Sequence, residues 1–222
     1  KPVFWKGMQT TDNSAIVLDP DAVGQTYPIP SDRFDLLVGQ VVHEGLSSIE
    51  WSEWVTSRVQ QQVTDQPAEA LPFLEAFLRS AEDIYVNELA KPRVWSVYLS
   101  RLWSKERTGS ERDPTLAPSP ESLAKVWKHQ ALTGSLPDAL HHDYQEPLRR
   151  LHDCTQAIRS LVSLPSPAQR REERVHIYLE AWASLYSILS EWETFVHSPD
   201  AVNLYDEAAP KVLRHVSQED QG

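Results

Sequence analysis

The fold is decided first by residues 31–49, which read SDRFDLLVGQVVHEGLSSI. Ser31 is predicted to cap the N-terminus of a helix, and Asp32 lies in the first turn, where the helix dipole favours a negative charge. Apolar residues recur three and four positions apart, the spacing of one buried helix face, at Phe34, Leu37, Val38, Val41, Val42, Leu46 and Ile49. The pattern predicts an amphipathic helix that continues to about Gln62.

On either side of this helix, the sequence predicts a mainly α-helical protein. Glycine is scarce, with 7 residues, and Trp is plentiful, with 8, a composition that favours helices joined by Pro-marked turns over a strand-rich barrel. Further apolar stripes predict helices after Pro72 and over residues 94–105, 121–131, 138–164 and 168–197. Residues 3–18 contain two short β-type runs around a turn cluster, which predict a small N-terminal β element.

The predicted helices group into two regions. Residues 1–107 form the first region, which contains the His43-Glu44 helix, and residues 121–222 form a second helical region that we expect to pack on the first as one domain. Between them, residues 108–120 contain Gly, Ser and three prolines, which predict an exposed loop.

Composition excludes several classes of function. The formal net charge is −11, and the pairs Arg149-Arg150 and Arg170-Arg171 are isolated, so we expect no nucleic-acid binding. No apolar run approaches the roughly 20 residues that span a membrane. Cys154 is the only cysteine, which excludes an internal disulfide, and no signal peptide is visible, so a cytoplasmic location is expected.

The chemically informative motif lies within the first predicted helix. In a His-Glu-x-x-His helix the two histidines lie four residues apart, so that both imidazoles reach one zinc ion and the Glu activates a zinc-bound water. Here His43 and Glu44 are present, but Ser47 occupies the second histidine position. A serine hydroxyl is a poor zinc ligand beside imidazole, so the spacing predicts an impaired metal site.

Two further segments accompany this motif. Residues 10–20 combine a turn cluster, an apolar run and Asp19-Pro20, and residues 81–88 contain Glu82-Asp83 on a later helix. With His43-Glu44, these segments resemble a degenerate zincin-like metallopeptidase domain, of the kind associated with von Willebrand factor A domains in cobaltochelatase-subunit-type proteins. The resemblance covers about residues 3 to 90 and implies that the helical domain contains a zincin-like α+β core.

The resemblance also implies roles for particular residues. Zinc would be held by His43 with Glu82 or Asp83, and Glu44 would be catalytic if the domain were active. Glu50 follows His43 by seven residues, almost two helical turns, and could replace the missing ligand. Because Ser47 removes one imidazole, we expect no bound cofactor, with zinc as the alternative.

Three functions follow from these expectations. The preferred one is a pseudoenzyme: a non-catalytic metallopeptidase-like domain that serves in protein–protein interaction or scaffolding. The resemblance implies a von Willebrand factor A domain or a MoxR-type ATPase as its partner. The first alternative is an active zinc-dependent hydrolase using His43 and Glu44. The second is a helical adaptor without metal ancestry, in which His43 is a polar residue of the core.

Other reactive or aromatic residues are given structural roles. His141, His142 and Asp143 are interpreted as solvated or capping residues, and Cys154 as a buried, inert thiol. Helical spacing predicts that most aromatic side chains pack between helices, with a partner-binding face as the alternative; they include Trp51, Trp54, Trp95, Trp103, Trp182 and Trp192.

Overall fold

The structure is a computed structural model, and the residues that it describes form a bundle of seven α-helices. These residues are 3–4, 10–11, 16–18, 28–64, 66–109, 118–136 and 140–192. The prediction of a mainly α-helical fold is confirmed. None of the helices in these ranges is both long enough and apolar enough to cross a membrane.

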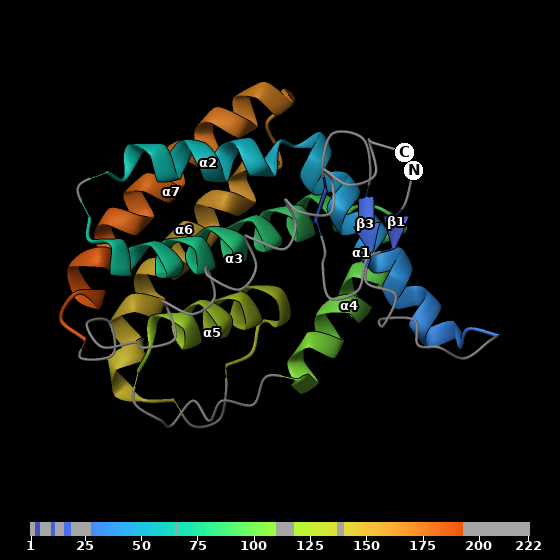
Figure 1. Ribbon diagram of the computed structural model, residues 1–222, viewed down its shortest axis with the longest axis horizontal. Helices are drawn as coiled ribbons and strands as arrows, with labels where there is room; N and C mark the ends of the chain where they lie inside the picture. The colour runs from blue at the N-terminus through green and yellow to red at the C-terminus, as the bar shows by residue number, and fades with distance from the viewer. Residues whose placement is uncertain are drawn as a thin grey trace, which may run out of the picture.

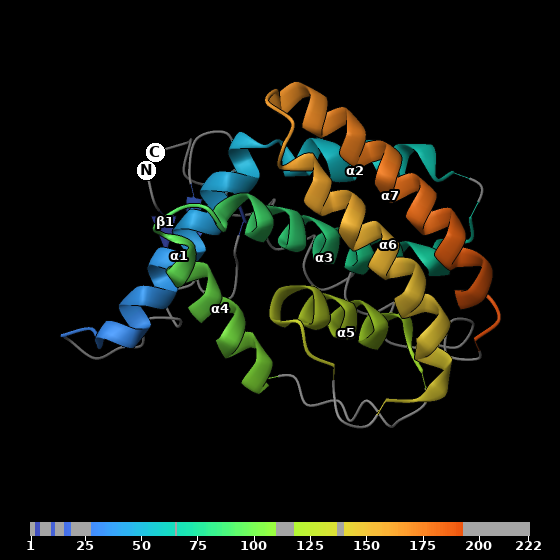
Figure 2. The same cartoon turned by 180° about the vertical axis from the view of Figure 1, so that it is seen from behind.

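Helix α3, Leu71–Ala90, is the centre of the bundle. It crosses the middle of the molecule, with α2 (Ser52–Gln62) and α7 (Pro167–Leu189) on one side and α5 (Pro120–Thr133) on the other (Figure 1). Helix α6, Gln145–Leu161, packs on α7 and also contacts α3 and α5 (Figure 2). Fourteen of the twenty α3 residues are buried, because the helix has neighbours on every side.

A second group of elements lies at one end of α3. Helix α1, Ser31–Ile49, packs along α4, Ser96–Gly109, and both also contact α3 (Figure 1). Gly39 permits the close approach of α1 to α4, because a Cβ atom at this position would lie 2.6 Å from the carbonyl oxygen of Tyr98. Close packing of these two helices sets the position of His43, which lies one turn further along α1.

Three short strands pair beside α1. They are β1 (Val3–Phe4), β2 (Thr10–Thr11) and β3 (Ile16–Leu18), with β3 in the middle, parallel to β1 and antiparallel to β2. The residues between these strands lie outside the described ranges. The small β element as a whole, and the zincin-like α+β core, therefore stay predictions.

The predicted helix from residue 31 to residue 62 is wrong in one respect, because it is two helices. Helix α1 ends at Ile49 and α2 begins at Ser52, and between them Trp51 has the left-handed backbone angles φ 61° and ψ 41°. A residue with left-handed backbone angles turns the chain out of a right-handed helix and so ends its ladder of hydrogen bonds. The break lets Glu50 turn inward, where its side chain is buried beneath α7.

Other helix ends also differ from the predictions. Ser31 is the first residue of α1 rather than its cap, and Pro30 occupies the capping position without a side-chain hydrogen bond, although Asp32 does lie in the first turn. The helix predicted over residues 138–164 begins only at Gln145, after the 3₁₀ turn η3, His142–Tyr144. Most of the predicted loop, residues 110–117, and residues 193–197 of the last predicted helix lie outside the described residues.

The hydrophobic core lies between α3 and the helices of the second half of the chain. Phe77 of α3 stacks on Trp127 of α5, with ring centroids 5.4 Å apart, and also contacts the rings of Tyr178 and Trp182 on α7. Cys154 is buried, as predicted, and burial raises the pKa of its thiol to about 12. A thiol that stays protonated at neutral pH is a poor nucleophile, which fits the interpretation of an inert residue.

Candidate functional site

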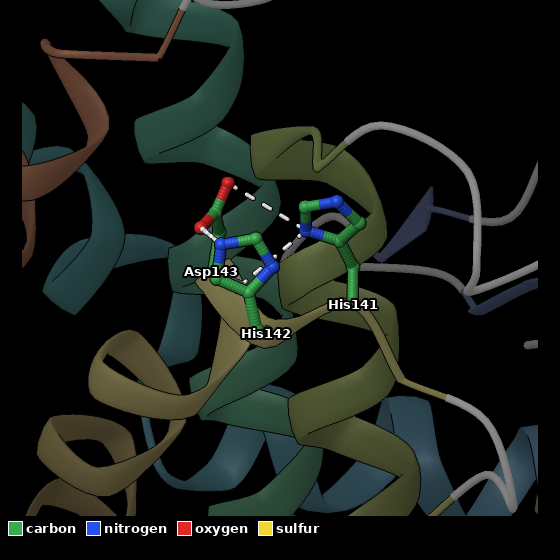
Figure 3. A group of neighbouring side chains, drawn as sticks. All are labelled: His141, His142 and Asp143. Atoms are coloured by element: carbon green, nitrogen blue, oxygen red, sulfur yellow. Dashed lines mark hydrogen bonds and ion pairs between the residues drawn. The ribbon is translucent and has the colours of Figure 1, made fainter.

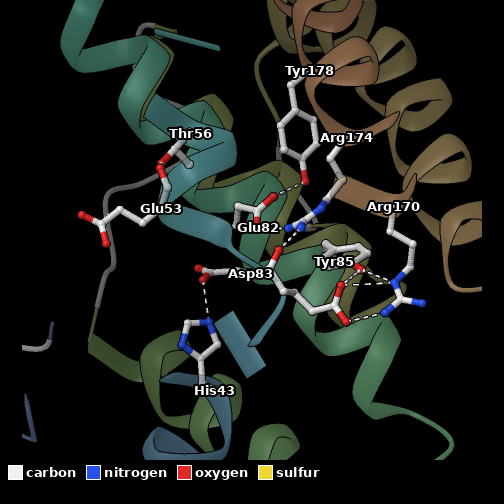
Figure 4. A network of polar contacts seen from close by, with 10 residues as sticks. His43, Glu53, Thr56, Glu82, Asp83, Tyr85, Arg170, Arg174 and Tyr178 are labelled. Carbon is white, nitrogen blue, oxygen red and sulfur yellow. Dashed lines mark hydrogen bonds and ion pairs between the residues drawn. The ribbon is translucent and has the colours of Figure 1, made fainter. Parts of the chain in front are cut away.

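His43, the central residue of the predicted metal motif, belongs to an ion-pair chain across three helices. Its Nε2 lies 3.0 Å from Oδ1 of Asp83 on α3, and the other carboxylate oxygen of Asp83 lies 3.0 Å from Nζ of Lys128 on α5. The His43 ring points directly toward the Asp83 carboxylate (Figure 4). The carboxylate thus bridges two cationic groups, one from each half of the chain.

Other groups complete the surroundings of the imidazole. Oε1 of Glu44 lies 3.5 Å from Nδ1 of His43, and the Trp103 ring of α4 meets the imidazole edge to face, with centroids 5.3 Å apart. Nζ of Lys128 lies 5.1 Å from the centroid of the same Trp103 ring. Aromatic faces attract cations, so the Trp103 ring supports the positive charge of Lys128 beside Asp83.

These contacts favour the protonated form of His43. Burial alone lowers the pKa of the imidazole, but the hydrogen bonds and negative charges of Asp83 and Glu44 outweigh it and raise the pKa to about 10. Burial alone would raise the pKa of Asp83. The hydrogen bond from His43 and the charge of Lys128 outweigh burial, so the pKa lies below its usual value. At neutral pH, therefore, His43 is an imidazolium ion whose nitrogens both carry protons and face carboxylates.

The two glutamates predicted as metal ligands are paired with arginine. Oε2 of Glu82 lies 2.5 Å from Nη1 of Arg174, and its Oε1 accepts a hydrogen bond of 2.7 Å from the hydroxyl of Tyr178 (Figure 4). The Arg174 side chain is fully buried and also donates to the backbone carbonyl of Glu50. Its guanidinium lies over the Tyr85 ring, 4.1 Å from the centroid.

Glu50 forms the matching pair. Arg170 donates to both carboxylate oxygens, over 2.5 Å to Oε1 and 3.1 Å to Oε2, and the Tyr85 hydroxyl donates to Oε2 over 2.7 Å. Burial raises the pKa of Glu50, but the bonds from Arg170 and Tyr85 lower it more, so the carboxylate stays charged. The pairing joins the break between α1 and α2 to the start of α7.

The structure thus brings together only part of the predicted metal site. Asp83 contacts His43, whereas Glu50 and Glu82 contact Arg170 and Arg174. Among the described side chains, three potential ligand atoms of His, Cys, Asp or Glu come together at residues 141–143 and not around His43. Since a bound zinc ion would have to displace protons from His43 and guanidinium groups from both glutamates, these residues do not fit a zinc site.

Sequence reasoning missed the cationic half of this network. Arg170, Arg174 and Tyr178 follow one another at intervals of four residues along α7, so they lie on one face of the helix. However, residues 169–174 read QRREER, so the sequence does not distinguish Arg170 and Arg174 from the polar residues between them. Lys128 and Trp103 carry no signal in the sequence either.

Comparison of the chain with protein-family models, with curated proteins and with solved structures gave no match. The resemblance to a metallopeptidase-like domain therefore stays a prediction from the His43-Glu44 and Glu82-Asp83 motifs.

Proposed function

We propose that the chain is a non-catalytic, metallopeptidase-like helical domain that serves as an interaction or scaffolding module. The observation that carries the proposal is the pairing of every acid predicted to bind metal with a cationic side chain: Asp83 with Lys128 and His43, Glu82 with Arg174, and Glu50 with Arg170. Ion pairs of this kind hold helices together. A catalytic zinc site needs three free protein ligands and an open position for water.

A second candidate is a helical adaptor without metal ancestry. It is favoured by the close packing of the His43 site, where the side chains of His43 and Asp83 are 17% and 9% exposed. Both candidates are non-catalytic, and they differ in whether α1 descends from a zinc-binding helix. The active hydrolase is disfavoured because its base, Glu44, would face a protonated His43 rather than a metal-bound water.

The first expected result concerns metal content and activity. After purification and dialysis without added metal, the protein should retain well under one zinc ion per chain and should not hydrolyse peptides, because Ser47 supplies no imidazole. Elemental analysis and a peptidase assay measure both properties. One tightly held zinc per chain, together with a hydrolytic activity that Glu44→Gln abolishes, would establish the active hydrolase instead.

Substitution of Ser47 separates the two non-catalytic candidates. If α1 descends from a zinc-binding helix, Ser47→His places a second imidazole one turn from His43. We then expect the variant to bind zinc about tenfold or more tightly than the wild type does. Ser48→His is the matched control, because residue 48 is exposed and lies off the face that carries His43. Equal zinc affinity in the two folded variants would favour the adaptor without metal ancestry.

An interaction role is supported by a cluster of apolar and aromatic side chains at the break between α1 and α2. Ile49 is 66% exposed and Trp51 is 55% exposed, although most residues of their type are buried. The guanidinium of Arg171 lies 4.5 Å from the ring centroid of Trp54 and 5.3 Å from that of Trp51. Trp and Arg dominate the binding energy of protein interfaces, so this cluster suits a protein partner such as a von Willebrand factor A domain.

Trp51→Gly tests this surface without damaging the fold. Glycine adopts the left-handed conformation of residue 51 freely, which offsets the lost contact with Arg171, so stability should stay within about 1 kcal/mol of the wild type. Affinity for a von Willebrand factor A domain should fall roughly tenfold or more in a surface-plasmon-resonance titration. Val94→Ala, which alters a residue 93% exposed elsewhere, should bind normally. Unchanged binding by Trp51→Gly would exclude this surface.

A further inference from the structure

Three consecutive residues in the second half of the chain bring metal-binding groups together. His141, His142 and Asp143 lie at the turn η3, just before α6, and one imidazole nitrogen from each histidine lies within 4.8 Å of the other and of a carboxylate oxygen (Figure 3). Imidazole nitrogen and carboxylate oxygen are ligands that zinc-type divalent cations prefer. Within the described part of the chain, this is the one group of three such ligands so closely spaced.

The separations between these atoms suit a shared ion. Nε2 of His142 lies 2.8 Å from Oδ1 of Asp143, and Nδ1 of His141 lies 3.5 Å from Oδ2. In a tetrahedral site with bonds of about 2.0–2.2 Å, neighbouring ligand atoms lie about 3.4 Å apart. The observed distances lie on either side of this value. These two distances end at different oxygens of Asp143, while one ligand atom from each of the three residues lies within 4.8 Å of the other two. A rotation of the side chains is needed to place all three groups around one cation.

The charges at this turn differ from those of the His43 network. Asp83, Glu82 and Glu50 are neutralised by lysine or arginine, whereas the ion pairs of Asp143 among the described side chains are with His141 and His142 alone. The two imidazole rings lie beside each other, with centroids 4.5 Å apart at 32°. A divalent cation at this turn would carry the charge opposite to that of the Asp143 carboxylate.

The backbone that carries the three ligands is fixed, while their side chains are open to water. Tyr144, the next residue, is buried, its hydroxyl accepts from the backbone N–H of Ser119 over 3.1 Å, and its ring meets that of Trp192. The His142 side chain, in contrast, is 80% exposed. An ion from solution can thus reach a preorganised turn, and water can fill its remaining positions.

We propose that His141, His142 and Asp143 bind a zinc-type divalent cation at the protein surface. The interpretation of these residues as capping or solvated is correct in that Nδ1 of His141 accepts the Asp143 N–H. That bond is long, 3.4 Å, so its loss costs little when the same lone pair binds metal. The site is independent of the proposed function, because it shares no residue with the His43 network.

The proposal is tested by titrating the metal-free 222-residue chain with zinc chloride in an isothermal titration calorimeter. We expect one zinc per chain, and His142→Ala should weaken binding about tenfold or more, because it removes one of two imidazole ligands. The fold should persist, since His142 is exposed. Asp143→Asn should also weaken binding, because an amide is uncharged.

Two matched variants locate the ion. His152→Ala removes another exposed histidine, which lies on α6 and contacts Gln156, and His43→Gln alters the α1 motif; both should bind zinc as the wild type does. The proposal is overturned if zinc does not bind, if His142→Ala binds it normally, or if magnesium binds as tightly as zinc. Loss of binding in His43→Gln alone would place the metal on α1 and overturn the surface site, whereas the peptidase assay alone decides whether the domain is catalytic.

Discussion

Arg174→Met is expected to lower the free energy of unfolding by about 3–5 kcal/mol, the range for breaking a buried ion pair by removal of one partner. The Arg174 side chain is fully buried and forms an ion pair with Glu82, whose carboxylate is 7% exposed. Methionine fills a similar volume but leaves this carboxylate charged and buried, with only the hydroxyl of Tyr178 as a donor. Urea denaturation followed by tryptophan fluorescence measures the loss.

Two comparison variants separate the buried charge from lost packing. Arg149→Met removes an arginine from the exposed ion pair with Glu146, and should leave the urea midpoint nearly unchanged. In the double variant Arg174→Met/Glu82→Gln, the remaining polar group is a neutral amide, so part of the lost stability should return. A single variant Arg174→Met as stable as the wild type would show that the pair does not stabilise the fold.

The helices of this protein could be predicted from local sequence, and their ends could not. Apolar residues at three-four spacing identified α1 and α3 because burial of one face dictates that spacing. The break at Trp51 could not be seen, since Trp and its neighbours are compatible with a continuous helix. The break places Glu50 in an ion pair with Arg170, a partner 120 residues away in the chain that local sequence does not reveal.

The candidate site was predictable to the same limited degree. The contact between His43 and Asp83 agrees with the expectation that an acid on a later helix faces the His-Glu helix. Local sequence gives no information on which cations then approach that acid. Lys128 comes from α5 and lies 45 residues beyond Asp83, so its position depends on how α5 packs on α3. Because these cations occupy the acids, the chemistry differs from that of a metal site.

The stability of the wild-type protein is expected to fall as the pH rises from about 7 to 9. The pKa of His43 is about 10 in the folded protein, against 6.5 for the free side chain. A group whose pKa is raised by folding stabilises the protein fully below its unfolded pKa, and this contribution is lost as pH rises toward the folded pKa. Between these values only the folded state holds the proton, so stability should fall by about 1 kcal/mol per pH unit.

His43→Gln removes the titrating group and should abolish this slope, while the amide can still donate to Asp83. His152→Gln is the control, because His152 is exposed on α6 and should leave the slope intact. Measurements below pH 9 isolate His43, since burial raises the pKa values of Cys154 and Tyr85, and both begin to reduce stability only near their ordinary values of 9.0 and 10.0. A wild-type protein equally stable at pH 7 and pH 9 would mean that His43 is not held as an imidazolium ion. Its nitrogen would then be free to bind a metal, and the main objection to a zinc site on α1 would be removed.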